Sequence, residues 1–152
     1  MADLPSQSEL WSTGEQICRH FDLGKIRQLK ALSHQGYSNF NARLETDLGT
    51  YVLRRYTEQP DEKITQELRL IDWLNAQGFP VVPPLRDSEG QARCRSNQEG
   101  PSRWIVFPFV EGEEPLPQPA IAHTMGGIVA RLHQLPEHPW KNQEYENLLS
   151  LQ

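Results

Sequence analysis

The strongest constraint on the fold is a strict alternation of side chains that begins at residue 40 and is followed by a turn and a second extended segment. Apolar or small residues alternate with polar ones from residue 40 to 46, which is the period of a strand with one buried face. The turn 47–50 then leads into a second strand, Tyr51 to Tyr56, so a hairpin is expected. An earlier strand, Ile26 to Ser33, would extend it to a three-stranded antiparallel meander. The inward residues of the alternating strand are expected to be Phe40, Ala42, Leu44 and Thr46.

Helices and a second hairpin surround this meander in the sequence. The spacing of apolar residues predicts helices over Ser8 to Phe21, Glu62 to Gln77 and Ala120 to Leu135. Residues Gln91 to Ser96 and Arg103 to Val110 are expected to pair as two further strands. The order helix, three strands, helix, two strands, helix predicts an α+β domain with a five-stranded antiparallel sheet and a helix packed on it.

The second and third helices each carry an apolar face. In the second helix Glu67 falls near the middle of that face, and Trp73 lies on the opposite side. The third helix is expected to turn its apolar face inward. The two faces comprise Ile64, Leu68, Leu70, Ile71 and Leu74 in the second helix, and Ile121, Met125, Ile128, Val129 and Leu132 in the third.

Charge and composition disfavour several classes of protein. With 15 basic and 20 acidic residues among 152, the net charge is −5, which is unsuited to sequence-independent binding of nucleic acid. Apolar runs stay well below the roughly 20 residues of a membrane span, and the N-terminal segment lacks the basic and apolar regions of a secretory signal. Cys18 and Cys94 are expected to be free thiols in a reducing compartment. We therefore expect a cytoplasmic protein that binds neither nucleic acid nor membrane.

The segment Gly36-Tyr37-Ser38-Asn39-Phe40-Asn41 is a candidate phosphate-binding loop. It lies between two expected strands, where glycine and small polar residues leave backbone N–H groups open to phosphate oxygens. A single glycine is a weak signal, so an ordinary turn is the alternative interpretation.

Glu67 is the second candidate, because a carboxylate on an apolar helix face needs a cation and hydrogen bonds to offset its desolvation. The strand Tyr51 to Tyr56 supplies either Arg54, which shares a face with Val52, or Arg55, which lies on the other face. A purely structural ion pair is the alternative to a functional one.

The third candidate is Phe107-Pro108-Phe109-Val110-Glu111-Gly112, an apolar strand that ends at a glycine before a proline-rich linker. The end of such a strand could present backbone groups to a flat apolar ligand. A simple edge strand is the alternative.

Taken in order, these segments resemble the N-terminal lobe of small-molecule kinases with the protein-kinase-like fold. The resemblance is greatest to the aminoglycoside phosphotransferase family, with its homoserine kinase and choline kinase relatives. Gly36 to Asn41 resembles the nucleotide-covering loop, Gly49 to Arg54 the strand with the phosphate-binding cation, and Glu67 the helix glutamate that pairs with this cation. Phe107 to Gly112 is similar to the hinge that meets adenine, and Met125 to His133 to the leucine-histidine helix after the hinge.

The resemblance implies ATP and Mg²⁺ as cofactors and a small hydroxylated acceptor for the complete enzyme. Arg54 would bind phosphate and Glu67 would orient the Arg54 side chain, although this family usually has lysine in place of Arg54. The ATP-binding residues that the resemblance implies are Gly36, Tyr37, Ser38, Asn39, Val52, Arg54, Glu67, Phe107, Phe109 and Val110.

The family's catalytic aspartate and its metal-binding asparagine and aspartate come after the leucine-histidine helix, in a separate lobe. His20-Phe21-Asp22 and Asp22-Leu23-Gly24 imitate such motifs, but they precede the phosphate loop, and the second is interpreted as a helix stop. We expect residues 1–110 to form the nucleotide-binding lobe, 111–119 a hinge and linker, and 120–152 the first helical segment of a second lobe that is otherwise missing. No catalytic or metal-ligating residue is assigned.

The sequence therefore favours the ATP-binding lobe of a small-molecule phosphotransferase, inactive by itself and part of a truncated or split enzyme. A non-catalytic, pseudokinase-like interaction module is the alternative, with an exposed apolar surface that would meet a second lobe or another copy. A further alternative is an α+β domain in which the pair Arg54–Glu67 does not form.

Overall fold

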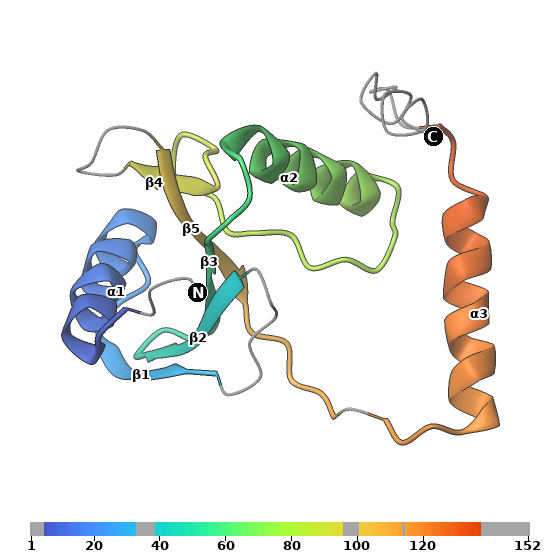
Figure 1. Cartoon of the computed structure of the whole chain (residues 1–152), viewed down its shortest axis with the longest axis horizontal. Coiled ribbons are helices and arrows are strands. Elements are labelled where there is room, and N and C mark those ends of the chain that lie inside the picture. Colours follow the sequence, from blue (N-terminus) through green and yellow to red (C-terminus); the bar gives the residue numbers. More distant parts are fainter. Residues whose placement is uncertain (1–4, 33–38, 96–100, 114, 138–152) are drawn as a thin grey trace. The chain divides into compact units, whose positions relative to one another are not determined.

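A computed structural model describes residues 5–32, 39–95, 101–113 and 115–137 (Figure 1). The chain divides into two compact units, Met1–Gly112 and Glu113–Gln152. The first unit is built on a sheet between two helices, and the described part of the second holds one helix.

The sheet is antiparallel throughout and has the strand order β1-β2-β3-β5-β4. Four strands have six to eight residues and the edge strand β4 has three. The α+β class and the antiparallel sheet are confirmed. The bounds are Ile26–Ala31 for β1, Asn39–Thr46 for β2, Thr50–Tyr56 for β3, Arg93–Arg95 for β4 and Pro101–Pro108 for β5.

The alternation that predicts β2 is confirmed residue by residue, since every second side chain of the strand is buried. The hairpin turn that follows is fixed by Thr46, whose hydroxyl accepts the N–H groups of Leu48 and Gly49 at 3.1 Å. Asp47 accepts the N–H of Lys25 at 2.6 Å, which joins this turn to the start of β1. The backbone of Gly24 passes so close that a Cβ there would lie 2.1 Å from Asp47 Oδ1.

Helix α1 (Gln7–Phe21) covers one face of the sheet (Figure 1). It begins with a capping box, in which Ser6 accepts the N–H of Glu9 and the Glu9 carboxylate accepts the N–H of Ser6. It ends at Asp22, which has a φ of 55°, so the expected helix stop is confirmed. The core on this side is formed by Leu10, Ile17, Cys18, Leu23, Leu29, Phe40, Ala42, Leu44, Leu53 and Val106.

Helix α2 (Asp61–Ala76) lies on the opposite face and is anchored along a narrow stripe (Figure 1). Only Ile64 and Leu68 of this helix are buried. The expectation that Leu70 faces the core is wrong, since its side chain is 41% exposed. The apolar face of α2 is wider than the part of the sheet on which the helix packs. The core on this side is formed by Tyr56, Ile64, Leu68, Ala92, Ile105 and Phe107.

Helix α3 (Pro119–His133) belongs to the second unit and has no buried residue. The prediction of an inward apolar face is therefore wrong for this structure: Met125, Val129 and Leu132 are 55%, 46% and 43% exposed. Residues 115–137 contain no second element of this unit against which the helix could pack. Among the described residues, no helix has the length and apolar content of a membrane span.

Candidate functional site

The candidate site lies on the face of the sheet that α2 partly covers, at neighbouring positions of β2, β3 and β5. In the antiparallel register Arg54 of β3 is paired with Asn41 of β2 on one side and with Ile105 of β5 on the other. Val52 lies two residues before Arg54 on the same face and packs against the α2-side core. Arg54 thus lies at the boundary between the apolar core on the α2 side and the polar side chains next to it.

Arg54 is held by three neighbours. Its Nη1 lies 3.8 Å from Glu67 Oε1, and its Nε donates a hydrogen bond of 3.2 Å to Asn41 Oδ1. Its guanidinium carbon lies 5.1 Å from the centre of the Phe107 ring, within cation–π range. The choice between Arg54 and Arg55 as the partner of Glu67 is therefore settled, and the pair forms.

Glu67 differs from its expected environment. The expectation of a carboxylate in the middle of a buried helix face is wrong, because its side chain is 36% exposed and that of Arg54 is 35% exposed. The ion pair between Glu67 and Arg54 lies at the edge of the apolar stripe of α2, not at its centre. Both groups keep part of their hydration, so they remain accessible to a ligand.

Sequence reasoning missed Tyr56. Its Oη donates a hydrogen bond of 2.7 Å to Glu67 Oε1, the oxygen that also faces Arg54. Burial, followed by the hydrogen bond to Glu67, raises the pKa of Tyr56 to about 12, so the hydroxyl stays a donor at neutral pH. The available signal was the strand period, which places Tyr56 on the face of Arg54, two residues away.

The predicted hinge segment lies at the end of β5. Phe107 is buried, whereas Val110 is 64% exposed. The N–H of Phe109 donates to the carbonyl of Thr50 at 3.1 Å, and the Arg43 guanidinium lies 4.7 Å from the centre of the Phe109 ring. A ligand at this edge would therefore meet the carbonyl of Phe109 or the backbone of Val110, not the N–H of Phe109.

Half of the predicted phosphate loop, namely Gly36, Tyr37 and Ser38, lies outside the described residues, whereas its second half belongs to strand β2. Asn39 is the first residue of β2. Its side-chain Oδ1 is shielded from solvent and has no hydrogen-bond partner in the described part of the chain. Asn39 therefore opens β2 with an unsatisfied acceptor beside the predicted loop.

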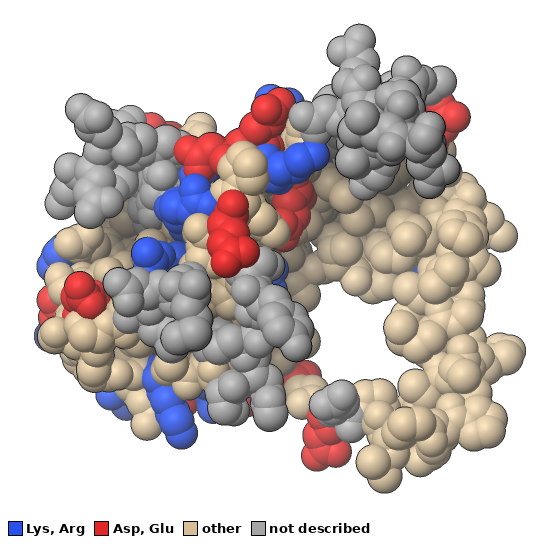
Figure 2. All heavy atoms as spheres, in the orientation of Figure 1, with Lys and Arg blue, Asp and Glu red and all other residues tan. Residues whose placement is uncertain are grey.

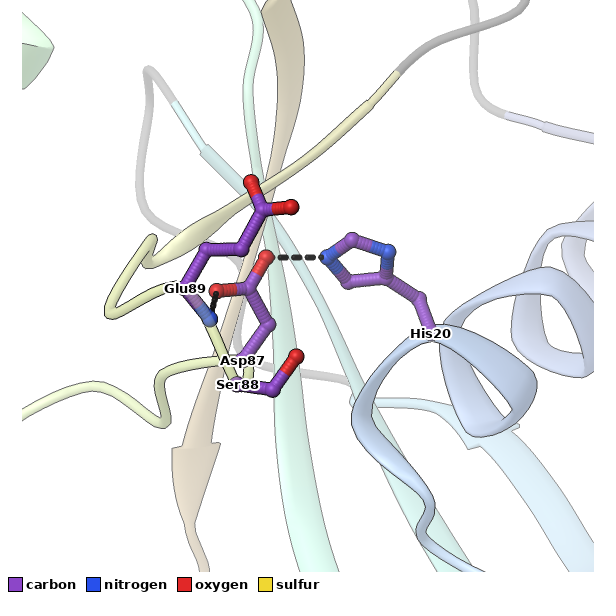
Figure 3. Close-up of a pocket in the computed structure, with 4 residues that line it drawn as sticks. All are labelled: His20, Asp87, Ser88 and Glu89. Atoms are coloured by element: carbon purple, nitrogen blue, oxygen red, sulfur yellow. Dashed lines mark hydrogen bonds and ion pairs between the residues drawn. The ribbon is translucent and has the colours of Figure 1, made fainter.

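A separate open pocket of about 240 Å³ is lined by His20, Asp87, Ser88 and Glu89 (Figure 3). His20 Nε2 lies 3.0 Å from Asp87 Oδ2, which ties the last turn of α1 to the turn before β4. The backbone N–H groups of Gln91 and Glu89 and the nearby His20 lower the pKa of Asp87. His20 thus makes a contact between α1 and the turn that contains Asp87.

Charged groups of both signs lie side by side on the surface of the first unit (Figure 2). Within the described ranges, no group of three or more His, Cys, Asp or Glu side chains could hold a metal ion. The candidate site combines the guanidinium of Arg54, the amide of Asn41 and the ring of Phe107 with the carboxylate of Glu67 and the hydroxyl of Tyr56.

The antiparallel sheet, the glutamate-bearing helix packed on one face and the strand arginine that faces this glutamate agree with the arrangement expected from the sequence. The phosphotransferase enzyme family model matches residues 29–149, and the chain belongs to this family. The predicted family resemblance is thereby confirmed.

Similar proteins include two homoserine kinases. That of Methylobacillus flagellatus is 28% identical over 119 residues, which cover 78% of this chain and 36% of the relative. That of Polaromonas naphthalenivorans is 30% identical over 115 residues, covering 76% and 35%. The chain thus spans little more than a third of the length of these relatives.

The fold is similar to that of a spectinomycin phosphotransferase, whose crystal structure contains ADP and spectinomycin. The TM-score is 0.67 at 16% sequence identity, and the match covers 89% of this chain and 40% of the other. The protein-kinase-like fold is confirmed by this likeness.

Proposed function

We propose that this chain is the ATP-binding lobe of a small-molecule phosphotransferase, which in the complete protein transfers the γ-phosphate of ATP to a hydroxyl group. The observation that carries the proposal is the partly exposed guanidinium of Arg54, positioned by Glu67 and Asn41 on the open face of the sheet. A cation that is oriented but not neutralised by a tight ion pair is available to phosphate oxygens.

In this proposal Arg54 binds the α- and β-phosphates, and Glu67 orients it. Arginine can grip phosphate with two parallel N–H donors, so replacing the usual lysine preserves the charge and adds directionality. Val52 and Phe107 would form the apolar surface against the base. The carbonyl of Phe109 and the backbone of Val110 would meet its edge, and Gly36 to Asn39 would cover the phosphates.

Mg²⁺ is proposed as the second cofactor, on the basis of family membership. It would neutralise charge on the β- and γ-phosphates. In the family that the chain resembles, the ligands of Mg²⁺ and the catalytic base come from a second lobe, and we propose the same for the complete enzyme. The similar homoserine kinases favour an amino-acid hydroxyl as acceptor, and the likeness to spectinomycin phosphotransferase keeps an aminoglycoside-type acceptor as the second candidate.

The test is calorimetric titration of the chain with ATP, for the wild type and for Arg54→Met, Glu67→Gln and Arg55→Met. Arg55 is the matched control, because it is the adjacent arginine of β3 and lies on the other face. The loss of a charged hydrogen bond should weaken binding about 10- to 100-fold in the Arg54 variant.

The Glu67 variant should weaken ATP binding as well, whereas the Arg55 variant should bind like the wild type. A non-catalytic interaction module predicts otherwise, since Glu67→Gln would then lower only the stability of the fold. Equal weakening by the Arg54 and Arg55 variants would contradict the proposed phosphate contact.

A further inference from the structure

Glu67 contacts two groups through one oxygen, and the two contacts differ in strength. The hydroxyl of Tyr56 is 2.7 Å from Oε1, which is a normal hydrogen bond to a carboxylate. Nη1 of Arg54 is 3.8 Å from the same atom, which is too long for a hydrogen bond. The orientation of the Glu67 carboxylate is therefore set by Tyr56.

Tyr56 is itself held firmly in the structure. Its side chain is completely buried in the core that joins α2 to the sheet. Its backbone carbonyl accepts a hydrogen bond of 2.6 Å from Nε of Arg103 on β5. The same guanidinium donates to the carbonyl of Gln59 and reaches Asp61, the first residue of α2, at 3.3 Å.

We infer that Tyr56 is the positioning residue of the nucleotide site: it holds the Glu67 carboxylate in place, so that Glu67 orients the Arg54 guanidinium without forming a tight ion pair with it. A direct, tight pair between Glu67 and Arg54 would occupy the donors that the phosphates need. The hydrogen bond from Tyr56 instead supplies the fixed partner that the carboxylate requires. This inference rests on the proposed function, because it concerns the same phosphate contact.

The phenol of Tyr56 is suited to this role because its hydroxyl stays protonated and therefore remains a donor to the Glu67 carboxylate. Burial and the carboxylate raise the pKa of Tyr56 to about 12, so the hydroxyl stays protonated and donates at neutral pH. Nε of Arg54 is meanwhile engaged by Asn41, which limits the rotation of the guanidinium. Tyr56 and Asn41, both neutral, thereby orient the carboxylate of Glu67 and the guanidinium of Arg54.

The experiment is a double-mutant cycle on ATP affinity with Tyr56→Phe, Glu67→Ala and the double variant. Alanine replaces Glu67 because a glutamine oxygen could still accept the hydroxyl of Tyr56. Tyr51→Phe is the matched control, since it removes a hydroxyl from the same strand on the α1 side. Thermal unfolding of each variant shows that the fold is retained, and Tyr56→Phe preserves the ring that fills the core.

Tyr56→Phe should weaken ATP binding about tenfold, the effect of one hydrogen bond to a charged group. In the Glu67→Ala background the same change should have a much smaller effect on affinity, because Tyr56 acts mainly through Glu67 and its direct interaction with Arg54 is the weaker of the two. The Tyr51 variant should bind like the wild type. If Tyr56 only supported the fold, Tyr56→Phe would lower the stability in both backgrounds. Its effect on ATP affinity would then be the same with and without Glu67.

Two outcomes overturn the inference alone: wild-type affinity in Tyr56→Phe, or a tenfold loss that persists in the absence of Glu67. In both cases ATP binding by the wild-type chain keeps the proposed function intact. Failure of the wild-type chain to bind ATP at all overturns the inference together with the proposed function.

Discussion

Replacing Ile64 by alanine should weaken the packing of α2 on the sheet, because Ile64 is the most deeply buried residue of this helix. Ile64 is completely buried, and it is one of only two buried residues of α2. The change removes three carbon atoms at about 0.8 kcal/mol each, or about 2.4 kcal/mol, before the cavity is counted. With the cavity left between α2 and the sheet, the loss in unfolding free energy should reach about 3–4 kcal/mol.

The assay is urea unfolding monitored by tryptophan fluorescence and circular dichroism, with Leu70→Ala as the control. Leu70 is an aliphatic residue of the same helix but is 41% exposed, so its truncation should lower stability by less than about 0.5 kcal/mol. Because α2 carries Glu67, Ile64→Ala should also weaken ATP binding. Equal losses of stability in the two variants would refute the assignment of a single narrow anchoring stripe.

Further predictions concern the turn beside β1, the cap of α1 and the ion pair between His20 and Asp87. Gly24→Ala should destabilise the chain by about 2 kcal/mol or more in urea unfolding, because Gly24 has a φ of +82° and the new Cβ would collide with Asp47. Ser6→Ala should lower the thermal stability by about 1 kcal/mol through loss of the capping box, measurable by calorimetry. The lowered pKa of Asp87 means that the folded state binds its proton more weakly than the unfolded state, so its contribution to stability is full at neutral pH and is lost as pH falls below the ordinary value of 3.8. The difference in urea midpoint between the wild type and Asp87→Asn should therefore shrink below pH 3.8, whereas a constant difference would contradict the lowered pKa, which the backbone N–H of Gln91 causes more than His20 does.

The strands were predictable because their signal is local. The alternation from Phe40 to Thr46 needs only the two-residue period of a strand and one buried face, and the structure buries these residues as expected. Helix α2 was likewise predicted to within a residue at each end. Secondary structure of this kind depends on neighbours in the chain, which the sequence displays directly.

The surroundings of Glu67 were only partly predictable because they depend on where α2 sits on the sheet. The helical period shows which side of α2 is apolar, but it does not show how much of that side the sheet covers. The burial of Leu70 and Glu67 was therefore overestimated. The bond from Tyr56 to Glu67 joins residues 11 positions apart in two different elements. Such a contact follows from the packing of helix against sheet, which no local pattern encodes.

The hinge segment likewise shows that the sequence predicts which residues form an element but not which partners their backbone groups bond. The sequence correctly indicates an apolar strand that ends near Val110, but it does not show that the N–H of Phe109 is already bonded to Thr50. That hydrogen bond depends on the register of β3 against β5. Register is set by pairing across the sheet, and a one-residue shift would exchange the groups presented to a ligand.

The most direct test of the central claim is a map of amide chemical-shift changes when the isotopically labelled chain is titrated with ATP. If ATP binds on the α2 side of the sheet, the largest changes should fall on β2, β3 and the end of β5, around Asn41, Arg54 and Val110. They should be absent from the buried residues of α1. Changes confined to the α1 side, or no change at millimolar ATP, would contradict the assignment of this face as the nucleotide site.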